Sequence, residues 1–187
     1  MWHNMTAHQR LQIAASDPEL APYISGSTEK WSASVVCAFA WSIDARDVLE
    51  LGAFEGLTTF KLAHPFPEAM IYAVEHDETR ANVVRKRCAD QGARNVQVIQ
   101  RDAIAFLREC IDLGRVFDFA FVDDDHTYAH VAEEIDLLKH IVRPGGLIVM
   151  HDVIGAFGLD QLVWHHGGRI IELPLLHAAG GLGVLRV

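Results

Sequence analysis

Apolar positions along the chain follow two alternating periods. Short, nearly continuous apolar runs, typical of strands buried on both faces, occupy residues 47–52, 70–77, 96–102, 117–125 and 145–153. Segments with helical spacing of apolar residues lie between them, at 55–63, 78–92, 103–114 and 130–142. This alternation predicts right-handed β-α-β crossovers and a mostly parallel sheet.

Further elements flank this alternating region. Before it, Thr28 is a predicted N-cap, and the apolar residues that follow recur at helical spacing. After it, we expect a short helix at 156–166 and two strands at 169–176 and 181–187. Residues 177–180 are too few for a crossover helix, so these two strands should pair antiparallel. The prediction is an α/β fold, a doubly wound, mostly parallel sheet of seven strands with an antiparallel last strand.

Acidic residues recur where the predicted strands end. In doubly wound sheets, ligands bind outside the carboxyl ends of the strands. Five successive strands carry acids at or next to this end: Glu50, Glu75 with Asp77, Asp102, Asp123 to Asp125, and Asp152. Helices carry acids too, but without this regularity. The sequence therefore predicts the functional site at this edge of the sheet.

The turn after the first strand indicates a nucleoside-containing cofactor. Gly52 and Gly56 let the backbone approach a ligand closely. Glu75 follows Gly52 by 23 residues, close to the offset of roughly 20 residues at which an acid binds ribose hydroxyls. The turn lacks the GxGxxG pattern of dinucleotide sites, and no Tyr-x-x-x-Lys pair occurs. An acidic rim instead favours a mononucleoside with a cationic centre, such as a sulfonium.

Composition narrows the class of protein. A length of 187 residues suits one domain over 1–187, and a net charge of −9 disfavours nucleic acid as a partner. No apolar stretch is long enough for a membrane span, and no signal peptide is recognised at the N-terminus. The three cysteines form no CxxC pair, which is typical of reduced thiols in the cytoplasm. Eleven histidines raise the question of a metal site.

Five segments resemble a class I S-adenosylmethionine-dependent methyltransferase: VLELGAFEG, YAVEHDE, VIQRDA, FDFAFVDDDHTY and PGGLIVMHDV. They keep the family's order and spacing over residues 29–187. The last two are similar to segments of small-molecule O-methyltransferases of the catechol and caffeoyl-CoA type, and of related bacterial sugar and antibiotic-tailoring enzymes. The resemblance implies a Rossmann-like methyltransferase fold and methyl transfer from S-adenosylmethionine to a hydroxyl of a small molecule. It also implies that a helical or loop segment, 1–28, covers the site.

The resemblance further implies how the cofactor binds. Gly52 and Gly56 are expected beside its methionine part, and Glu75 at the ribose hydroxyls. Asp102 and Ala103 are expected beside the adenine. The full set of implied cofactor-binding residues is Glu50, Gly52, Ala53, Phe54, Gly56, Thr58, Glu75, His76, Asp102, Ala103 and Asp123.

Relatives of this type often hold a divalent cation at the ends of the fourth and fifth strands. The resemblance makes Asp123, Asp152 and His151 the candidate ligands, for Mg²⁺ or another divalent cation. This chain has His-Asp where those relatives have Asp-Asn, so the ligand set stays open. It also lacks the lysine of the catechol-type enzymes. His126 stands near that position and is a second candidate, as a general base. Asp123 and His126 are thus the predicted catalytic residues.

The residues that follow Asp123 and surround His126 are expected to have structural rather than catalytic roles. Asp124 and Asp125 are expected to cap the next helix or to face solvent. His126 and His130 lie four residues apart and are expected on one helix face, a spacing that can chelate a transition metal, but His130 is expected to be a surface or edge histidine.

Two other functions stay open at this point. The first is an NAD(P)-dependent oxidoreductase, which the missing GxGxxG pattern disfavours. The second is a non-catalytic S-adenosylmethionine-binding protein. A small-molecule acceptor is the expected partner, and tryptophans at the surface would favour a homodimer.

Overall fold

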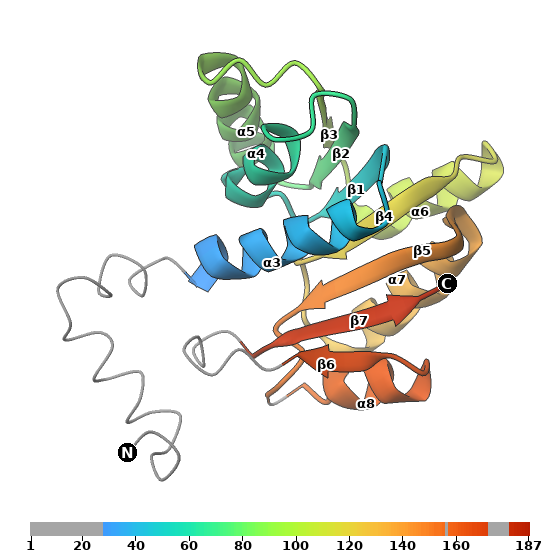
Figure 1. The fold of residues 1–187 in the computed structure, drawn as a ribbon. Coiled ribbons are helices and arrows are strands. Elements are labelled where there is room, and N and C mark those ends of the chain that lie inside the picture. The colour runs from blue at the N-terminus through green and yellow to red at the C-terminus, as the bar shows by residue number, and fades with distance from the viewer. Residues whose placement is uncertain (1–27, 156, 172–179) are drawn as a thin grey trace, which may run out of the picture.

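The computed structural model describes residues 28–155, 157–171 and 180–187. Figure 1 shows a central sheet between two layers of helices. The helices are α3 (Thr28–Ser42), α4 (Leu57–Ala63), α5 (Glu78–Asp90), α6 (Ala103–Asp112), α7 (Tyr128–Ile141) and α8 (Leu159–His165). The strands are β1 (Asp47–Leu51), β2 (Met70–Glu75), β3 (Val96–Gln100), β4 (Phe117–Val122), β5 (Val142–His151), β6 (Arg169–Ile171) and β7 (Leu182–Arg186).

The sheet has the expected topology. Its strand order is β3-β2-β1-β4-β5-β7-β6, with the first five strands parallel to one another and β7 antiparallel to both β5 and β6. The predicted doubly wound sheet and its antiparallel last strand are therefore confirmed. The strand expected at 169–176 is confirmed for Arg169–Ile171, and its remainder lies outside the described residues. The expected covering segment, 1–28, also lies outside them except for Thr28.

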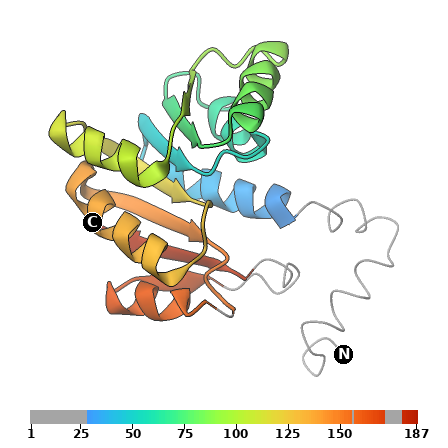
Figure 2. The same cartoon turned by 180° about the vertical axis from the view of Figure 1, so that it is seen from behind.

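The two faces of the sheet are covered by different helices (Figures 1 and 2). Apolar residues of α3, α4 and α5 pack on one face, and those of α6, α7 and α8 pack on the other. Strands β1 and β4 contribute side chains to both cores, as their continuous apolar sequence predicts. The chain changes direction across the sheet between β1 and β4. Their carboxyl ends therefore form the crevice in which such folds bind ligands.

Several element boundaries differ from expectation, and two of them affect the site. Helix α4 begins at Leu57 rather than residue 55, because Gly56 adopts a left-handed conformation (φ 76°) as its N-cap. Helix α7 begins at Tyr128, two residues earlier than predicted, after the N-cap Thr127. His126 therefore lies in the loop before α7. The prediction that His126 and His130 share a helix face is wrong.

Two expectations from composition also concern the described residues. None of the helices in the described ranges has the length and apolarity needed to cross a bilayer. Cys37, Cys88 and Cys110 are buried free thiols, which agrees with the absence of a CxxC pair.

Candidate active site

The turn after β1 joins three strands. The backbone N–H groups of Gly52 and Ala53 both donate to the carbonyl oxygen of Val74, each at 3.0 Å. Gly52 has a φ of 84°, and a Cβ there would lie 2.2 Å from the backbone oxygen of Asp123. Only glycine fits such a position. Backbone contacts therefore hold the ends of β1, β2 and β4 together.

Glu75 lies at the end of β2 and is 4% exposed. Its Oε2 accepts a hydrogen bond from the backbone N–H of Phe54 (2.8 Å), and its Oε1 accepts one from Asp77 (2.9 Å). Each carboxylate oxygen has two lone pairs, so the carboxylate can accept further hydrogen bonds. Glu75 is thus a fixed, buried acceptor of the kind that binds a pair of hydroxyls.

Glu50 is the second buried acid of this region, and it points from β1 toward α4. The hydroxyl of Thr59 donates to its Oε2 at 2.5 Å. Burial raises the pKa of Glu50 to about 8, although this hydrogen bond opposes the shift. A cation bound beside Glu50 would therefore stabilise a charge that the protein alone holds poorly.

Two adjoining cavities lie along this turn. The larger has a volume of about 530 Å³, and the smaller, about 210 Å³, lies beside Glu50. Gly52, Phe54 and Asp123 line both. The larger is also lined by Glu75, His76, Asp102 and Ala103, and the smaller by Ala53 and Thr58. Of the predicted cofactor residues, only Gly56 lines neither of these two cavities in the described structure. A Cβ there would meet Val84, so its part is conformational.

The sequence analysis missed two arginines that line the larger cavity, Arg80 and Arg101. The guanidinium of Arg80 stacks over the ring of Phe54, 4.5 Å from its centroid. Arg101 pairs with Glu109 at 2.5 Å. The signal for Arg101 was its place directly before Asp102. No comparable signal marks Arg80, which lies in the first turn of α5.

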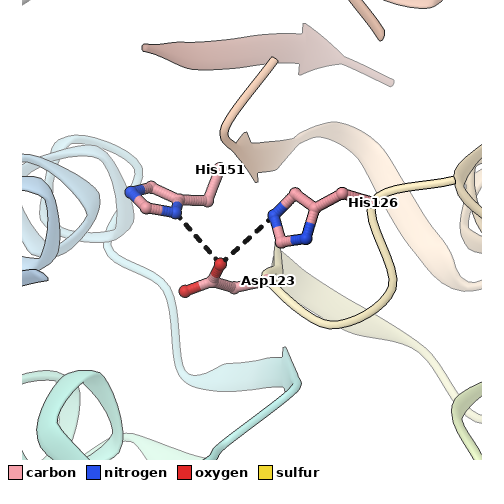
Figure 3. Close-up of side chains that lie close together, drawn as sticks. All are labelled: Asp123, His126 and His151. Carbon is pink, nitrogen blue, oxygen red and sulfur yellow. Dashed lines mark ion pairs between the residues drawn. The ribbon is translucent and has the colours of Figure 1, made fainter. Parts of the chain in front are cut away.

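A carboxylate between two imidazoles lies on the other side of the crevice (Figure 3). Oδ1 of Asp123 is 3.0 Å from Nδ1 of His151, at the end of β5, and 3.6 Å from Nε2 of His126. Asp152 approaches the same histidines, with Oδ1 3.5 Å from His151 Nδ1 and Oδ2 3.9 Å from His126 Nε2. The structure thus brings together all four predicted catalytic and metal-binding residues.

Asp123 and His126 shift each other's pKa values. Burial opposes ionisation of Asp123, but hydrogen bonds and charge from His126 and His151 outweigh it and lower its pKa. The nearby carboxylate of Asp123 raises the pKa of His126 in turn, although burial opposes that shift. Counting described residues only, His126 Nε2 and Asp152 Oδ1 are buried without a partner at hydrogen-bond distance and angle. Such atoms are suited to a bound cation or substrate.

A third, more open hollow adjoins this group. Its lining includes the acidic groups of Asp124, Asp125 and Asp152, the imidazole of His126, and the apolar side chains of Ile154 and Phe157. Both apolar side chains are exposed, at 40% and 57%. A small molecule with an apolar body and a polar reactive group would fit such a wall.

The expectations about the loop between β4 and α7 hold only in part. His130, expected as a surface or edge histidine, is 21% exposed, and its Nε2 lies 3.2 Å from Asp124 Oδ2 and 3.4 Å from Glu134 Oε1. Asp124 therefore faces α7 rather than solvent. Asp125 is exposed, as expected for one of the two acids, and accepts a hydrogen bond from the backbone N–H of Thr127 (2.8 Å). The expected capping by an aspartate is wrong, because Thr127 is the N-cap of α7. Glu134, which the sequence analysis did not consider, is fully buried, and burial followed by the charge of Asp124 raises its pKa.

Comparisons with known proteins agree with this geometry. Residues 49–153, more than half of the chain, match a methyltransferase domain family. A catechol O-methyltransferase of Mycobacterium tuberculosis is 31% identical over 151 residues, which cover 79% of this chain and 65% of that protein. A tapetum-specific methyltransferase 1 of Arabidopsis thaliana is 32% identical over 116 residues, 60% of this chain and 48% of that protein. The chain spans about half to two thirds of these relatives.

Solved structures of low sequence identity share the fold. The O-methyltransferase TomG from Streptomyces achromogenes, in complex with SAM, has a TM-score of 0.76 at 18% identity, covering 98% of this chain and 99% of that one. An O-methyltransferase from Bacillus cereus, in complex with SAH, has a TM-score of 0.72 at 16% identity, covering 97% and 90%. The chain therefore belongs to the methyltransferase domain family and has the class I fold of S-adenosylmethionine-dependent enzymes.

Proposed function

We propose that this protein transfers a methyl group from S-adenosylmethionine to a hydroxyl of a small molecule. The proposal rests mainly on one observation: the cavities and the polar groups lie along one continuous edge, at the carboxyl ends of the strands. Cavities beside Glu50 and Glu75 meet, at Asp123, a group with the basic and acidic side chains that this reaction needs. Family membership and the O-methyltransferase relatives support it.

In this proposal, the cofactor occupies the two adjoining cavities. The adenosine part lies in the larger one, with its ribose hydroxyls on Glu75 and its adenine near Asp102, Ala103 and His76. Asp102 also caps α6 by accepting a hydrogen bond from Ala105 N (2.9 Å), so its backbone is fixed for that contact. The methionine part lies in the smaller cavity.

Acidic residues that line the smaller cavity can stabilise the positive charge of a sulfonium. Glu50, Gly52, Ala53, Phe54 and Thr58 line it, together with Asp123. A positive sulfonium near Glu50 and Asp123 is attracted to both acids. The acids therefore help to orient the cofactor with its methyl group toward β4 and β5.

The transfer step is a displacement at the methyl carbon. The acceptor oxygen attacks in line with the bond between sulfur and carbon, and the new carbon–oxygen bond forms as that bond breaks. The electron pair returns to sulfur, so the sulfonium becomes a neutral thioether. The hydroxyl proton passes to the imidazole of His126, which Asp123 orients and makes more basic.

A divalent cation also fits this group. Asp123, His151 and Asp152 would hold it, since His151 Nδ1 lies 3.0 Å from Asp123 Oδ1 and 3.5 Å from Asp152 Oδ1, and Asp152 Oδ1 is among the buried atoms without a hydrogen-bond partner in the described chain. When bound, such an ion lowers the pKa of a coordinated hydroxyl. The residues themselves position the acceptor and keep water away from the cofactor's methyl group.

The hollow beside Ile154 and Phe157 is the proposed acceptor site. Its apolar wall suits an aromatic ring, and two relatives carry the name catechol O-methyltransferase. Catechol is therefore the first acceptor to test.

The decisive experiment for the proposal combines binding with turnover. Calorimetry should show that S-adenosylmethionine and S-adenosylhomocysteine bind, and that NAD does not. Incubation with S-adenosylmethionine, Mg²⁺ and catechol should give a methylated product. Failure to bind either sulfur compound would refute the proposal. Binding without transfer to any acceptor screened would favour a non-catalytic S-adenosylmethionine-binding protein.

The metal part is tested separately. Asp123→Ala and Asp152→Ala should each abolish Mg²⁺ binding in calorimetry, because each removes a carboxylate ligand. Cofactor affinity should change by no more than a few-fold. Asp112→Ala, an exposed acid at the end of α6, is the matched control. Unchanged Mg²⁺ binding in both variants would contradict the assigned ligand set.

Two expectations from the sequence remain proposals of this kind. A homodimer would elute at twice the monomer mass in size-exclusion chromatography with light scattering. A cytoplasmic location would appear as co-fractionation with cytosolic markers.

A further inference from the structure

A second cluster of side chains that can bind a metal ion lies next to the group that contains Asp123. Asp124 belongs to the loop after β4, whereas His130 and Glu134 lie one helical turn apart on α7. His130 Nε2 is 3.2 Å from Asp124 Oδ2 and 3.4 Å from Glu134 Oε1. The polar atoms of all three residues lie within 4.8 Å of one another. None of these three residues is used in the proposed methyl transfer.

Glu134 is the residue of this cluster that most clearly indicates a bound group. Its side chain is 0% exposed. Within the described part of the chain, neither of its carboxyl oxygens has a hydrogen-bond partner, and the same holds for Oδ1 of Asp124. A buried polar group without such a partner is costly, and a carboxyl especially so. Glu134 is aimed at His130 and Asp124, so a bound group between the three would satisfy it.

We propose that Asp124, His130 and Glu134 hold a divalent transition-metal ion, in a site separate from that at Asp123. One imidazole nitrogen and two carboxylates suit Zn²⁺ or Mn²⁺ better than Mg²⁺, which prefers oxygen ligands. The two carboxylates also balance the charge of a dication.

The distances agree with a shared ion. Two ligand atoms bound at about 2.1 Å and separated by angles of 90° to 110° lie roughly 3.0 to 3.4 Å apart. The separations of 3.2 Å and 3.4 Å from His130 Nε2 fall within this range. His130 thus already lies at a ligand-to-ligand distance from each of the two carboxylates.

The ion would connect the loop after β4 to the first two turns of α7. That loop carries Asp123 and His126, so the ion would fix the residues of the neighbouring group. Asp124 and His130 also line the larger cavity, which places the site in its wall. Open coordination positions would face that cavity.

The rival explanation is a proton shared between Glu134 and Asp124, with no metal. The variant Glu134→Gln distinguishes the bound metal ion from the shared proton, because a glutamine copies the shape of a protonated glutamate but is a poor metal ligand. Protein stripped with a chelator is dialysed against Zn²⁺, its zinc content is measured by elemental analysis, and its Tm is recorded with and without Zn²⁺. His130→Gln is the second variant. Asp136→Asn, an exposed acid on the same helix, is the matched control.

We expect Glu134→Gln and His130→Gln each to hold one zinc ion fewer per chain than the wild type and the Asp136→Asn control. The rise in Tm caused by Zn²⁺ should shrink in both. Asp123→Ala should lose a different ion, so that the Asp123→Ala/Glu134→Gln double variant loses both. Equal zinc content in the wild type, Glu134→Gln and His130→Gln would overturn the proposal. An unchanged zinc content with a higher Tm in Glu134→Gln would identify the shared proton. None of these results depends on methyl transfer.

Discussion

The two halves of the carboxyl edge are built in different ways. After β1 and β2, each acid accepts hydrogen bonds from donors that are not themselves ionisable. Backbone N–H groups bind Glu75, and the hydroxyl of Thr59 binds Glu50. After β4 and β5, the polar side chains mainly face one another, with separations of 3.0 to 3.9 Å between Asp123, Asp152 and the two histidines.

This difference separates a preformed binding region from one that a ligand completes. Because the donors to Glu75 are backbone N–H groups, we expect them to keep their positions when a cofactor binds. Around His126, buried polar atoms still lack hydrogen bonds within the described residues. Substitutions in the first half should therefore affect folding and cofactor binding together, whereas those in the second should affect chemistry and metal binding.

The largest effect is expected at Gly52, where the two halves touch. In Gly52→Ala, the new Cβ would overlap the backbone of Asp123, and alanine at φ 84° is strained besides. We expect a loss of several kcal/mol in the free energy of unfolding and no measurable cofactor binding. Gly114→Ala is the control, since its φ is 63° but nothing lies within 4 Å of its Cβ. Urea unfolding gives the comparison, and equal losses would disprove the close contact.

The second effect concerns Glu75 alone. In Glu75→Gln, the amide NH₂ would face one of the two backbone N–H groups, and the negative charge is lost. A hydrogen bond to a charged group contributes about 1.5 to 3 kcal/mol, so cofactor affinity should fall by roughly 10- to 150-fold. The exposed Glu68→Gln is the control. An unchanged dissociation constant in calorimetry would place the ribose elsewhere.

The third effect tests the other half. His126→Ala should lower kcat by about 10² to 10⁴, the usual contribution of a general base, and leave cofactor affinity within about two-fold. Because Asp123 raises the pKa of His126 above 6.5, the wild-type rate should rise with pH through a value above 6.5 as the imidazole loses its proton. The variant should lack this limb, and the exposed His140→Ala should keep it. Identical pH profiles in both variants would rule out His126 as the base.

The fourth effect is a gradual pH dependence of stability that comes from Glu50. Its pKa of about 8 in the folded protein exceeds the 4.5 of an exposed glutamate, so the folded state retains a proton that the unfolded chain releases. Its contribution to stability is complete below pH 4.5 and is lost as pH rises through about 8. The slope is at most about 1.4 kcal/mol per pH unit for one proton. Glu50→Gln should flatten the stability curve between pH 6 and 8. A slope equal to that of the wild type would contradict the raised pKa.

The sequence was a good guide where topology alone decides proximity. Parallel strands end at the same edge, so acids after β1, β2, β4 and β5 had to approach one another, and they do. The antiparallel β7 followed from the short connection before it. These predictions needed only the order of elements.

The sequence was a poor guide where helix phase decides proximity. The apolar pattern located α7 but not its first residue, and each residue turns the helix by about 100°. The true start at Tyr128 places His126 in the loop and turns His130 toward Asp124 and Glu134. The spacing of His130 and Glu134, four residues apart, was a signal for this cluster. The contact of Arg80 with Phe54 depends on the unusual φ of 48° at Phe54, which no pattern announces.

The central claim is that cofactor binding and methyl transfer belong to separate halves of one edge. A calorimetric titration of S-adenosylhomocysteine into the wild type, Glu75→Gln and His126→Ala tests it most directly. We predict wild-type affinity for His126→Ala and an affinity at least ten-fold weaker for Glu75→Gln. Equal affinities in both variants, or a larger loss in His126→Ala, would contradict the account.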